Sequence, residues 1–327
     1  MNAGTPFESA RTHAFAATSS FAGVPATRLG DLRGARAVIV GAPFDWGTSY
    51  RAGTRFGPKA IRESDYFGAD AYRPHLPTGL NALEGVVDIG DIELHPGDIE
   101  GDLERIADTV GQISAAGSIP IVLGGDHTIT YANATGVARV HGFGEVALVH
   151  FDAHADTGET TGYGALYGHG TPMRRLVESG AVPGNRFVQI GLRGYWPGPE
   201  TVAWMKDQGM RGYMMSQIEE RGLGPVVEEA VAYAGADATG VFLSIDIDVV
   251  DPGMAPGTGT PEPGGLTSRQ ILDTVRRMSR ELNVLGADIV EVSPPYDGPG
   301  AITALLANRI VLEILNGLAE RAAGISS

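Results

Sequence analysis

The segment Val146-Ala147-Leu148-Val149-His150-Phe151-Asp152-Ala153-His154-Ala155-Asp156 runs from an apolar stretch directly into a cluster of ionisable side chains. The apolar part has the length and the β-branched content of a buried strand. Because alternate residues of an extended chain share a face, Asp152, His154 and Asp156 can point the same way. The segment Val241-Phe242-Leu243-Ser244-Ile245-Asp246-Ile247-Asp248 repeats this pattern. Carboxylates crowded beside a core repel one another, and a divalent cation relieves that repulsion.

Other apolar runs that end in turn residues predict further strands. The predicted strands are 37–40, 119–123, 146–151, 186–191, 212–215, 241–247 and 284–292. Apolar residues recur at three- to four-residue steps over 99–113, 226–231, 271–278 and 310–318, which predicts helices, and Thr267-Ser268 is a start signal for the third. Strands that alternate with amphipathic helices indicate an α/β fold with a parallel sheet covered on both faces. We expect an N-terminal arm over residues 1–35 and a single domain over 36–327.

Composition narrows the function classes. The chain has 327 residues, 43% of them hydrophobic, which is enough for a large core. The formal net charge of −15 argues against nucleic-acid and anionic-membrane partners. The absence of cysteine excludes disulfides and thiolate ligands, so any metal must be held by oxygen and nitrogen donors. No stretch approaches the roughly 18 apolar residues of a membrane-spanning helix, and residues 1–25 lack the apolar core of a secretory signal, so we expect a cytoplasmic protein.

Ligands of parallel α/β sheets bind beyond the carboxyl ends of the strands, and a third cluster of residues lies at such an end. It is Gly124-Gly125-Asp126-His127, and with the two acidic segments it gives six candidate metal ligands, His127, Asp152, His154, Asp156, Asp246 and Asp248. This donor set suits Mn²⁺, Ni²⁺, Fe²⁺ or Zn²⁺, and six donors fit two ions better than one.

Each motif alone also has a structural explanation. Asp-x-Asp often caps a loop or binds a single Mg²⁺, Asp-x-His-x-Asp can be a solvated turn, and a lone histidine is more often structural. Three strand ends that deliver such residues to one edge favour the metal site.

The chain resembles the ureohydrolases, which include arginase, agmatinase and guanidinobutyrase, and it looks closest to the agmatinase-like branch. The resemblance rests on the segments 47–51, 55–58, 124–127, 150–156, 244–252, 255–261 and 291–294, and it extends from about residue 37 to 315. It implies a three-layer α/β/α sandwich around a mostly parallel eight-stranded sheet. It also implies two divalent metal ions, Mn²⁺ first and Ni²⁺ as the alternative.

The resemblance also implies roles for individual residues. One metal ion would take His127, Asp152, Asp156 and Asp246, and the other Asp152, His154, Asp246 and Asp248. The implied reaction is hydrolysis of a guanidino group to an amine and urea by a water that the two ions activate.

Three of the implied roles concern catalysis. Glu291 would pair with the planar guanidinium, and its structural alternative is a cap at a strand end. Asp156 would also handle the proton of the attacking oxygen. His169, in Tyr167-Gly168-His169-Gly170-Thr171, would move protons or contact the intermediate, although a loop histidine can also be inert.

The tail of the substrate decides its identity, and the sequence leaves the tail open. Glu159 would suit the amine of agmatine. Arg174 or Arg175 would suit the carboxylate of guanidinobutyrate or guanidinopropionate, unless both lie on the exposed face of a helix. Tyr167, with Tyr163 and Trp196, would narrow the pocket for guanidine or a biguanide derivative.

Two departures from the family pattern bear on the tail. The loop Thr157-Gly158-Glu159 lacks the Asn and Ser residues with which arginases grip an α-amino acid, so arginine is disfavoured. Agmatinase-like chains commonly place a histidine near the position after Asp297, where this chain has Gly298-Pro299-Gly300, which leaves the shape of the pocket open.

Two rival classes are weaker. A binuclear phosphoesterase also uses Asp and His clusters, but few Lys or Arg flank these clusters to hold a phosphate. A non-catalytic subunit of a hetero-oligomer should have lost ligands, and this chain keeps all six and Glu291. The resemblance implies a homo-oligomer, a trimer or hexamer, with a hetero-oligomer containing a paralogue as the alternative.

Overall fold

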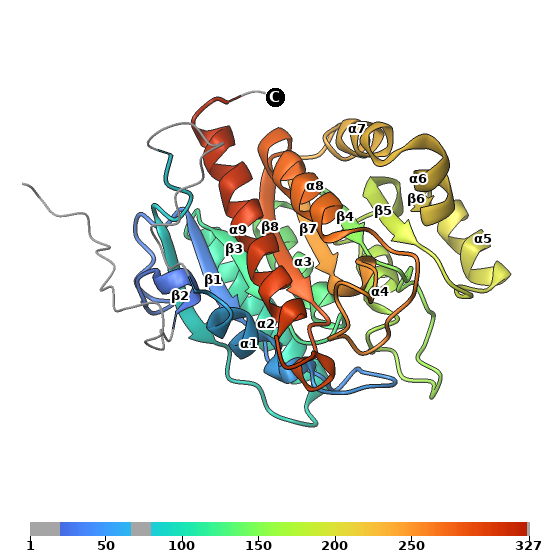
Figure 1. The fold of residues 1–327 in the computed structure, drawn as a ribbon, viewed down its shortest axis with the longest axis horizontal. Coiled ribbons are helices and arrows are strands. Elements are labelled where there is room, and N and C mark those ends of the chain that lie inside the picture. The colour runs from blue at the N-terminus through green and yellow to red at the C-terminus, as the bar shows by residue number, and fades with distance from the viewer. Residues whose placement is uncertain (1–19, 67–79, 326–327) are drawn as a thin grey trace, which may run out of the picture.

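Eight strands form one sheet at the centre of the computed structural model, which describes residues 20–66 and 80–325 (Figure 1). The strands are β1 (Ala37–Gly41), β2 (Val86–Asp91), β3 (Ile119–Leu123), β4 (Val146–Phe151), β5 (Phe187–Leu192), β6 (Arg211–Met214), β7 (Gly240–Asp246) and β8 (Val284–Val290). Their order across the sheet is β2-β1-β3-β8-β7-β4-β5-β6, and all neighbours pair in parallel. Every residue of β4 and β7 is buried, as expected for strands covered on both faces.

Helices cover both faces of the sheet. The helices are α1 (Gly57–Glu63), α2 (Ile99–Ala115), α3 (Ile129–His141), α4 (Pro172–Ser179), α5 (Pro199–Asp207), α6 (Met215–Arg221), α7 (Leu223–Ala234), α8 (Ser268–Glu281) and α9 (Ile302–Ala322). Apolar residues of α1, α7, α8 and α9 pack on one face, and those of α2, α3 and α4 pack on the other. The chain is therefore the three-layer α/β/α sandwich that the resemblance implied.

The predicted strands are confirmed with shifts of one or two residues at the ends, and the four predicted helices are confirmed as α2, α7, α8 and α9, although α9 begins eight residues earlier than predicted. Helix α8 begins as its start signal predicted, because Thr267 accepts a hydrogen bond from Gln270 N at 3.2 Å while its own N–H donates to Gln270 Oε1 at 2.8 Å. Strand β2 was missed. Its Val-Val-Asp-Ile-Gly-Asp sequence breaks the apolar run with Asp88, which is buried because Arg62 Nε donates to its Oδ2 at 2.8 Å.

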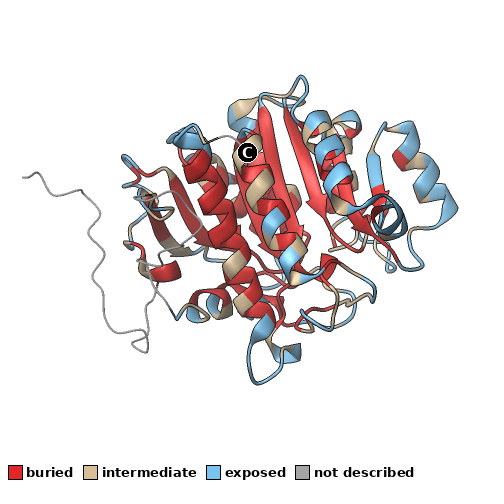
Figure 2. Cartoon of the chain, turned by 45° about the horizontal axis from the view of Figure 1, so that its top comes forward, coloured by how far each residue is buried: buried red, intermediate tan, exposed pale blue. Residues whose placement is uncertain are grey.

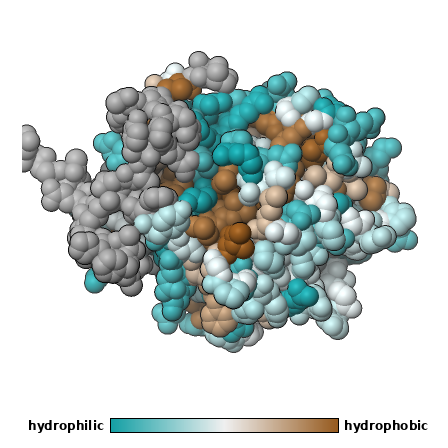
Figure 3. Space-filling view, in the orientation of Figure 1, coloured by the Kyte–Doolittle hydropathy of each residue, from teal (hydrophilic) through white to brown (hydrophobic). Residues whose placement is uncertain are grey.

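Helix α9 corrects the expectation that no stretch is apolar enough to span a membrane. The helix has 21 residues, and an 18-residue window of it has a mean hydropathy of 1.4, so by length and composition it could span a membrane. However, 83% of the apolar window is buried inside the protein, and Figure 2 shows this helix as mostly buried. Burial of this kind is typical of a core helix. Figure 3 shows the outer face of the same helical layer, where hydrophobic patches lie among hydrophilic residues.

The sheet topology brings four strand ends together. Strands β3, β8, β7 and β4 are consecutive in the sheet, although β8 is far from β3 in the chain and β7 is far from β4. All four are parallel, so their carboxyl ends lie at the same edge, where ligands of α/β sheets bind. The boundary between an arm and a domain at residue 35 stays a prediction, and residues 1–19 lie outside the described part of the chain.

Candidate metal centre and active site

The six predicted ligands and Glu291 all lie at this edge of the sheet. His127 follows β3, Glu291 follows β8, Asp246 ends β7 and Asp152 follows β4. The sequence predicted the convergence of β3, β7 and β4. The structure adds β8, which lies between β3 and β7 in the sheet. Glu291 directly follows the last residue of β8, so it lies between the strand ends that carry His127 and Asp246.

Two of these residues have an unusual backbone. Asp156 has a φ of 51° and Glu291 a φ of 63°, both in the left-handed region. For residues other than glycine this conformation costs on the order of 1–3 kcal/mol and persists only where the surroundings hold it. Glu291 N donates to Gly125 O at 2.9 Å, and Asp156 O accepts from Met173 N at 3.1 Å. These backbone contacts hold the left-handed conformation, and both side chains therefore point in a different direction from that of a residue in a regular extended strand.

The first half of the cluster surrounds His127. Its Nδ1 lies 3.0 Å from Asp152 Oδ2, 3.0 Å from Asp156 Oδ2 and 3.2 Å from Asp246 Oδ2. These are the four residues that the resemblance assigned to one ion. The sequence reached this set by position alone, and the structure brings all four side chains together.

The second half of the cluster surrounds His154. Its Nδ1 lies 3.3 Å from Asp152 Oδ1 and 3.0 Å from Asp248 Oδ2. Asp152 therefore faces the two halves with different oxygens, which is the arrangement of a bridging carboxylate. Asp246 points only its Oδ2 toward His127, because its Oδ1 accepts a hydrogen bond from Asp248 N at 2.8 Å. The geometry thus supports a bridging position for Asp152 more directly than for Asp246.

The cluster is electrostatically strained without a cation. Burial and the charges of Asp248 and Asp152 raise the pKa of Asp246 well above its usual value. Burial and the charge of Asp152 raise the pKa of Asp248 to about 6. Burial opposes ionisation of Asp152 as well, but its three histidine neighbours outweigh this and hold its pKa well below the usual value. Bound cations would favour the ionised form of all three carboxylates.

The residues present fit a pair of hard or borderline divalent ions. His127 Nδ1 and Asp248 Oδ2 are buried and have no hydrogen-bond partner, which costs free energy unless a further group meets them. Donors bound at about 2.1 Å around an octahedral ion lie roughly 3 Å apart. The separations around His127 and His154 are of this size. Oxygen and imidazole donors without thiolate suit Mn²⁺ and Ni²⁺ among the candidates.

His150 belongs to this site, although the sequence predicted no role for it. It is fully buried in β4, and its Nε2 lies 2.8 Å from Asp152 Oδ2. Gln189 Nε2 lies 2.9 Å from His150 Nδ1 and donates to Ala155 O at 2.8 Å. Because a carbonyl can only accept, the amide nitrogen of Gln189 must face it, and its second hydrogen points at His150 Nδ1. His150 therefore carries its proton on Nε2 and donates it to Asp152.

A row of buried, hydrogen-bonded side chains lies behind His127. Its Nε2 contacts Ser244 Oγ at 3.0 Å, and Ser244 Oγ contacts Thr130 Oγ1 at 3.2 Å. Thr130 and Asn133 both donate to Asp288 Oδ2 at 2.8 Å. With a hydrogen on Nε2, His127 leaves Nδ1 free to bind a metal, as second-shell partners of ligating histidines commonly arrange.

Glu291 connects the cluster to the predicted loop histidine. Its Oε1 accepts from His127 N at 2.8 Å and lies 3.0 Å from His169 Nδ1. Its Oε2 is buried and has no hydrogen-bond partner. Burial opposes protonation of His169, but Glu291, with Asp126 and Asp156, outweighs it and raises the pKa of His169 to about 9. Oε2 is therefore the carboxylate oxygen that still lacks a donor or a positively charged partner.

Asp126 is a further residue without an assigned role, and it fixes the loop opposite His169. Asp126 Oδ2 accepts from Gly47 N at 2.8 Å, and Gly47 O accepts from His169 N at 3.1 Å. A Cβ on Gly47 would lie 2.0 Å from Thr128 Oγ1, so only glycine fits this approach. The contact joins segments that lie far apart in sequence, which is why no local signal predicted it.

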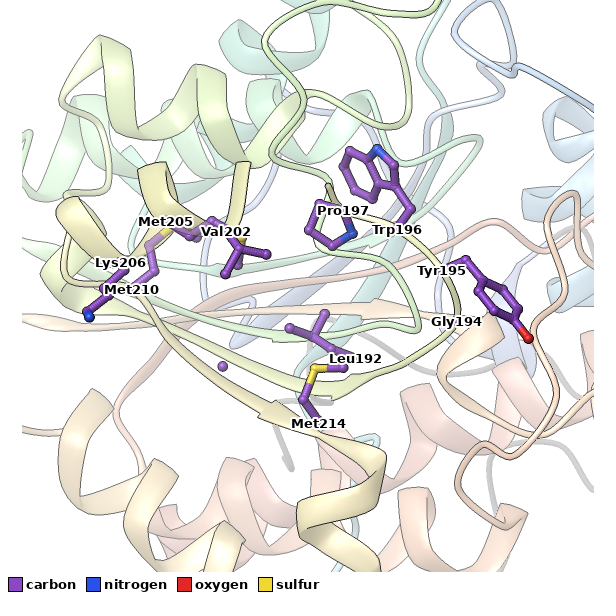
Figure 4. A pocket seen from close by; sticks show the side chains of 11 residues that line it. Leu192, Gly194, Tyr195, Trp196, Pro197, Val202, Met205, Lys206, Met210 and Met214 are labelled. Carbon is purple, nitrogen blue, oxygen red and sulfur yellow. The ribbon is translucent and has the colours of Figure 1, made fainter. Parts of the chain in front are cut away.

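A small cavity opens over the cluster. Its volume is about 160 Å³, and its lining consists of Ser49, His154, Asp156, His169, Gly170, Trp196, Asp246 and Thr260. A larger apolar cavity of about 380 Å³ lies beside it, near the edge strand β6, and Trp196 lines both (Figure 4). Trp196 therefore lies at the small cavity, and its role in narrowing the pocket for a small ligand stays a prediction.

The structure does not bring the other predicted tail residues into the small cavity. Glu159 is exposed, and Tyr167 packs on Tyr131 with ring centroids 5.8 Å apart, so neither belongs to the lining. Tyr163 is 93% exposed. Arg174 pairs with Glu178, and so does Arg175, which places both arginines in contacts of helix α4. A role of Glu159 or Tyr167 in substrate binding stays a prediction.

Comparison with known proteins identifies the family. The model of the arginase family matches residues 35–316. The chain belongs to the arginase family. It is 38% identical to a guanidinopropionase of Pseudomonas aeruginosa over 97% of both chains, and 41% identical to a mitochondrial agmatinase of Gallus gallus over 86% of this chain and 81% of the other. The solved structure of proclavaminate amidinohydrolase from Streptomyces clavuligerus matches with a TM-score of 0.86 and 37% identity, over 95% of this chain and 100% of the other.

These arginase-family relatives confirm the ureohydrolase resemblance and the fold that it implied. They do not single out one substrate, because a guanidinopropionase and an agmatinase match at nearly equal identity. The members of the family to which this chain is similar are hydrolases that act on amidino C–N bonds.

Proposed function

We propose that this protein hydrolyses a small guanidino compound to urea and an amine. The observation that carries the proposal is the position of Glu291. Its carboxylate reaches the cluster through Oε1, which accepts from His127 N at 2.8 Å, while its Oε2 is buried and has no hydrogen-bond partner. A carboxylate that is itself deprived of solvent is a strong partner for a planar guanidinium. The cluster beside it suits the ions that activate water.

The proposed cofactor is a pair of divalent ions, with Mn²⁺ first and Ni²⁺ as the alternative. His127, Asp152, Asp156 and Asp246 would hold one ion, and Asp152, His154, Asp246 and Asp248 the other. When bound, the two ions would supply Lewis acidity that lowers the pKa of a shared water to near neutrality.

The residues of the chain perform the remaining tasks. Glu291 orients the guanidinium and keeps it positively charged, which makes its carbon more electrophilic. Asp156 lines the cavity and belongs to the cluster, so its carboxylate can accept a proton from the attacking water. His169 also lines the cavity and lies on the side of Glu291, where it can return a proton to the departing amine.

The cavity favours a substrate with a short tail. Its volume is about 160 Å³, and the residues of its lining outside the predicted metal ligands carry no carboxylate and no Lys or Arg. Agmatine would therefore lack the acidic partner that Glu159 was expected to provide. The carboxylate of a guanidino acid would likewise lack a Lys or Arg partner. We expect guanidine, which has no tail, to be cleaved faster than agmatine or the guanidino acids, and agmatine faster than arginine.

The proposal is tested with metal-stripped protein and a panel of guanidino compounds. The panel contains guanidine, guanidinopropionate, guanidinobutyrate, agmatine and arginine, each assayed for urea with Mn²⁺ or Ni²⁺ supplied. We expect urea from at least one short compound and from none without metal. Release of phosphate from simple phosphate esters, with no urea from any compound, would favour the phosphoesterase alternative. The homo-oligomer and the cytoplasmic location stay predictions from the sequence.

A further inference from the structure

Ser49 meets His169 at the rim of the small cavity. Its hydroxyl Oγ lies 2.6 Å from His169 Nε2, and its backbone N–H donates to the same nitrogen at 3.1 Å. The other ring nitrogen, Nδ1, lies 3.0 Å from Glu291 Oε1. Ser49 and His169 both line the cavity over the cluster. A hydroxyl, an imidazole and a carboxylate are thus connected in one row that begins in the cavity.

The two contacts of Ser49 respond differently to the charge of the ring. A backbone N–H can only donate, so its hydrogen bond requires a bare Nε2 and places the ring proton on Nδ1, toward Glu291. A hydroxyl can donate or accept, so the contact through Oγ persists when Nε2 gains a proton. The carboxylates that face the ring, Glu291, Asp126 and Asp156, favour that proton. Ser49 Oγ is therefore the partner that serves both states of His169.

We propose that Ser49 is a proton relay between His169 and the departing amine. In the relay step the N–H bond at His169 Nε2 breaks and an O–H bond forms at Ser49 Oγ. The original O–H bond of Ser49 breaks in the same step, and its proton bonds to the amine nitrogen. Ser49 thus keeps one hydrogen, and the net result is the transfer of one proton from His169 to the amine. The proposal rests on the proposed function, because that function supplies the leaving amine.

The loop geometry supports this assignment. Gly47 is held to Asp126 and to the backbone of His169, which fixes Ser49 two residues farther along the chain. The positions of the Ser49 hydroxyl and of the ring are therefore set by the same two strand-end loops. Positioning of this kind is what proton transfer requires, since donor and acceptor must lie within about 2.6–3.2 Å of each other.

The test compares three variants of the metal-loaded protein on the best guanidino substrate. Ser49→Ala keeps the backbone N–H and removes the hydroxyl, Ser49→Thr restores a hydroxyl, and Ser216→Ala removes an exposed hydroxyl on α6 as a control. We expect kcat to fall about 10–100-fold in Ser49→Ala, up to the lower end of the range for general acid catalysis, with KM changed less than threefold. Ser49→Thr should recover most of the kcat, and Ser216→Ala should match the wild type.

A spectroscopic measurement tests the contact without turnover. In the Zn²⁺-loaded protein labelled with ¹⁵N-histidine, comparison with His169→Gln identifies the ring signals of His169. The Nε2 signal should move in Ser49→Ala and stay in place in Ser216→Ala. An unmoved Nε2 signal, or a wild-type kcat in Ser49→Ala, refutes the relay while the proposed function stands. Absence of urea from every compound with wild-type protein refutes the proposed function, and the relay with it.

Discussion

Replacement of Glu291 by Gln isolates the charge that is proposed to bind the guanidinium. The two side chains have the same shape, so the acceptor for His127 N and the packing at the strand end can persist. The change removes the negative charge from the free Oε2, which is buried and has no protein partner. Hydrogen bonds to charged groups contribute about 1.5–3 kcal/mol each, and one such bond from the guanidinium is lost. At about 1.4 kcal/mol per tenfold, kcat/KM should fall roughly 10–150-fold.

The assay is urea release under steady state, with metal content measured on the same samples. Glu291→Gln should keep the metal content of the wild type, because Glu291 contacts the backbone of His127 and not its ring. Glu291→Ala should lose more activity, since it also removes the acceptor for His169. Wild-type kcat/KM in Glu291→Gln would refute the assignment of Glu291 as the guanidinium partner.

Four further results are expected. Asp248→Asn should weaken metal binding by roughly 10²-fold or more in calorimetric titration, since changes behind a ligand alone cost about 10–100-fold, and unchanged binding would remove Asp248 from the ligand set. Gln189→Met should weaken metal binding about tenfold by releasing His150 from its donor position on Asp152, and an unaltered affinity would show that His150 does not orient that carboxylate. Metal affinity should rise from pH 5 to pH 7 with release of protons, because the metal-free Asp248 has a pKa of about 6 and must ionise to bind; a flat profile contradicts this. In metal-free protein the pKa of His169 is raised to about 9, so its pairing with Glu291 stabilises the fold fully below about pH 6.5 and is lost as the pH rises through 9. The excess stability of the wild type over His169→Gln, on the order of 3 kcal/mol in denaturant unfolding at pH 6, should vanish by pH 10, and a constant difference would exclude this pairing.

The strand ends that carry the candidate site were predictable because their signals are local. Each of the segments 119–127, 146–156 and 241–248 contains both a buried run and the polar residues that follow it. Pairing of these ends in one sheet follows from the alternation of strands and helices. The six candidate ligands could therefore be named before the structure was seen, and the structure brings all six together.

Other elements carried no such signal. Helix α3 was missed because residues 129–138 are all buried except Tyr131, so no polar face marks the helical period. Strand β2 was missed because Asp88 interrupts its apolar run, and its partner Arg62 lies 26 residues away.

The contacts around the cluster could not be predicted either, because they join residues that lie far apart in the chain. His150 acquires its role from Gln189, 39 residues away, and His169 is reached by Ser49 over 120 residues. Such contacts depend on the neighbours that strands and loops acquire in the fold, and a single sequence does not specify them.

The measurement that tests the central claim most directly is the metal stoichiometry of active protein. Metal-stripped protein is titrated with Mn²⁺ and separately with Ni²⁺, and bound metal per chain is determined by elemental analysis alongside urea release. The account predicts that activity reaches its maximum at two ions per chain for the preferred metal. Full urea-releasing activity in protein that holds no transition metal would contradict it.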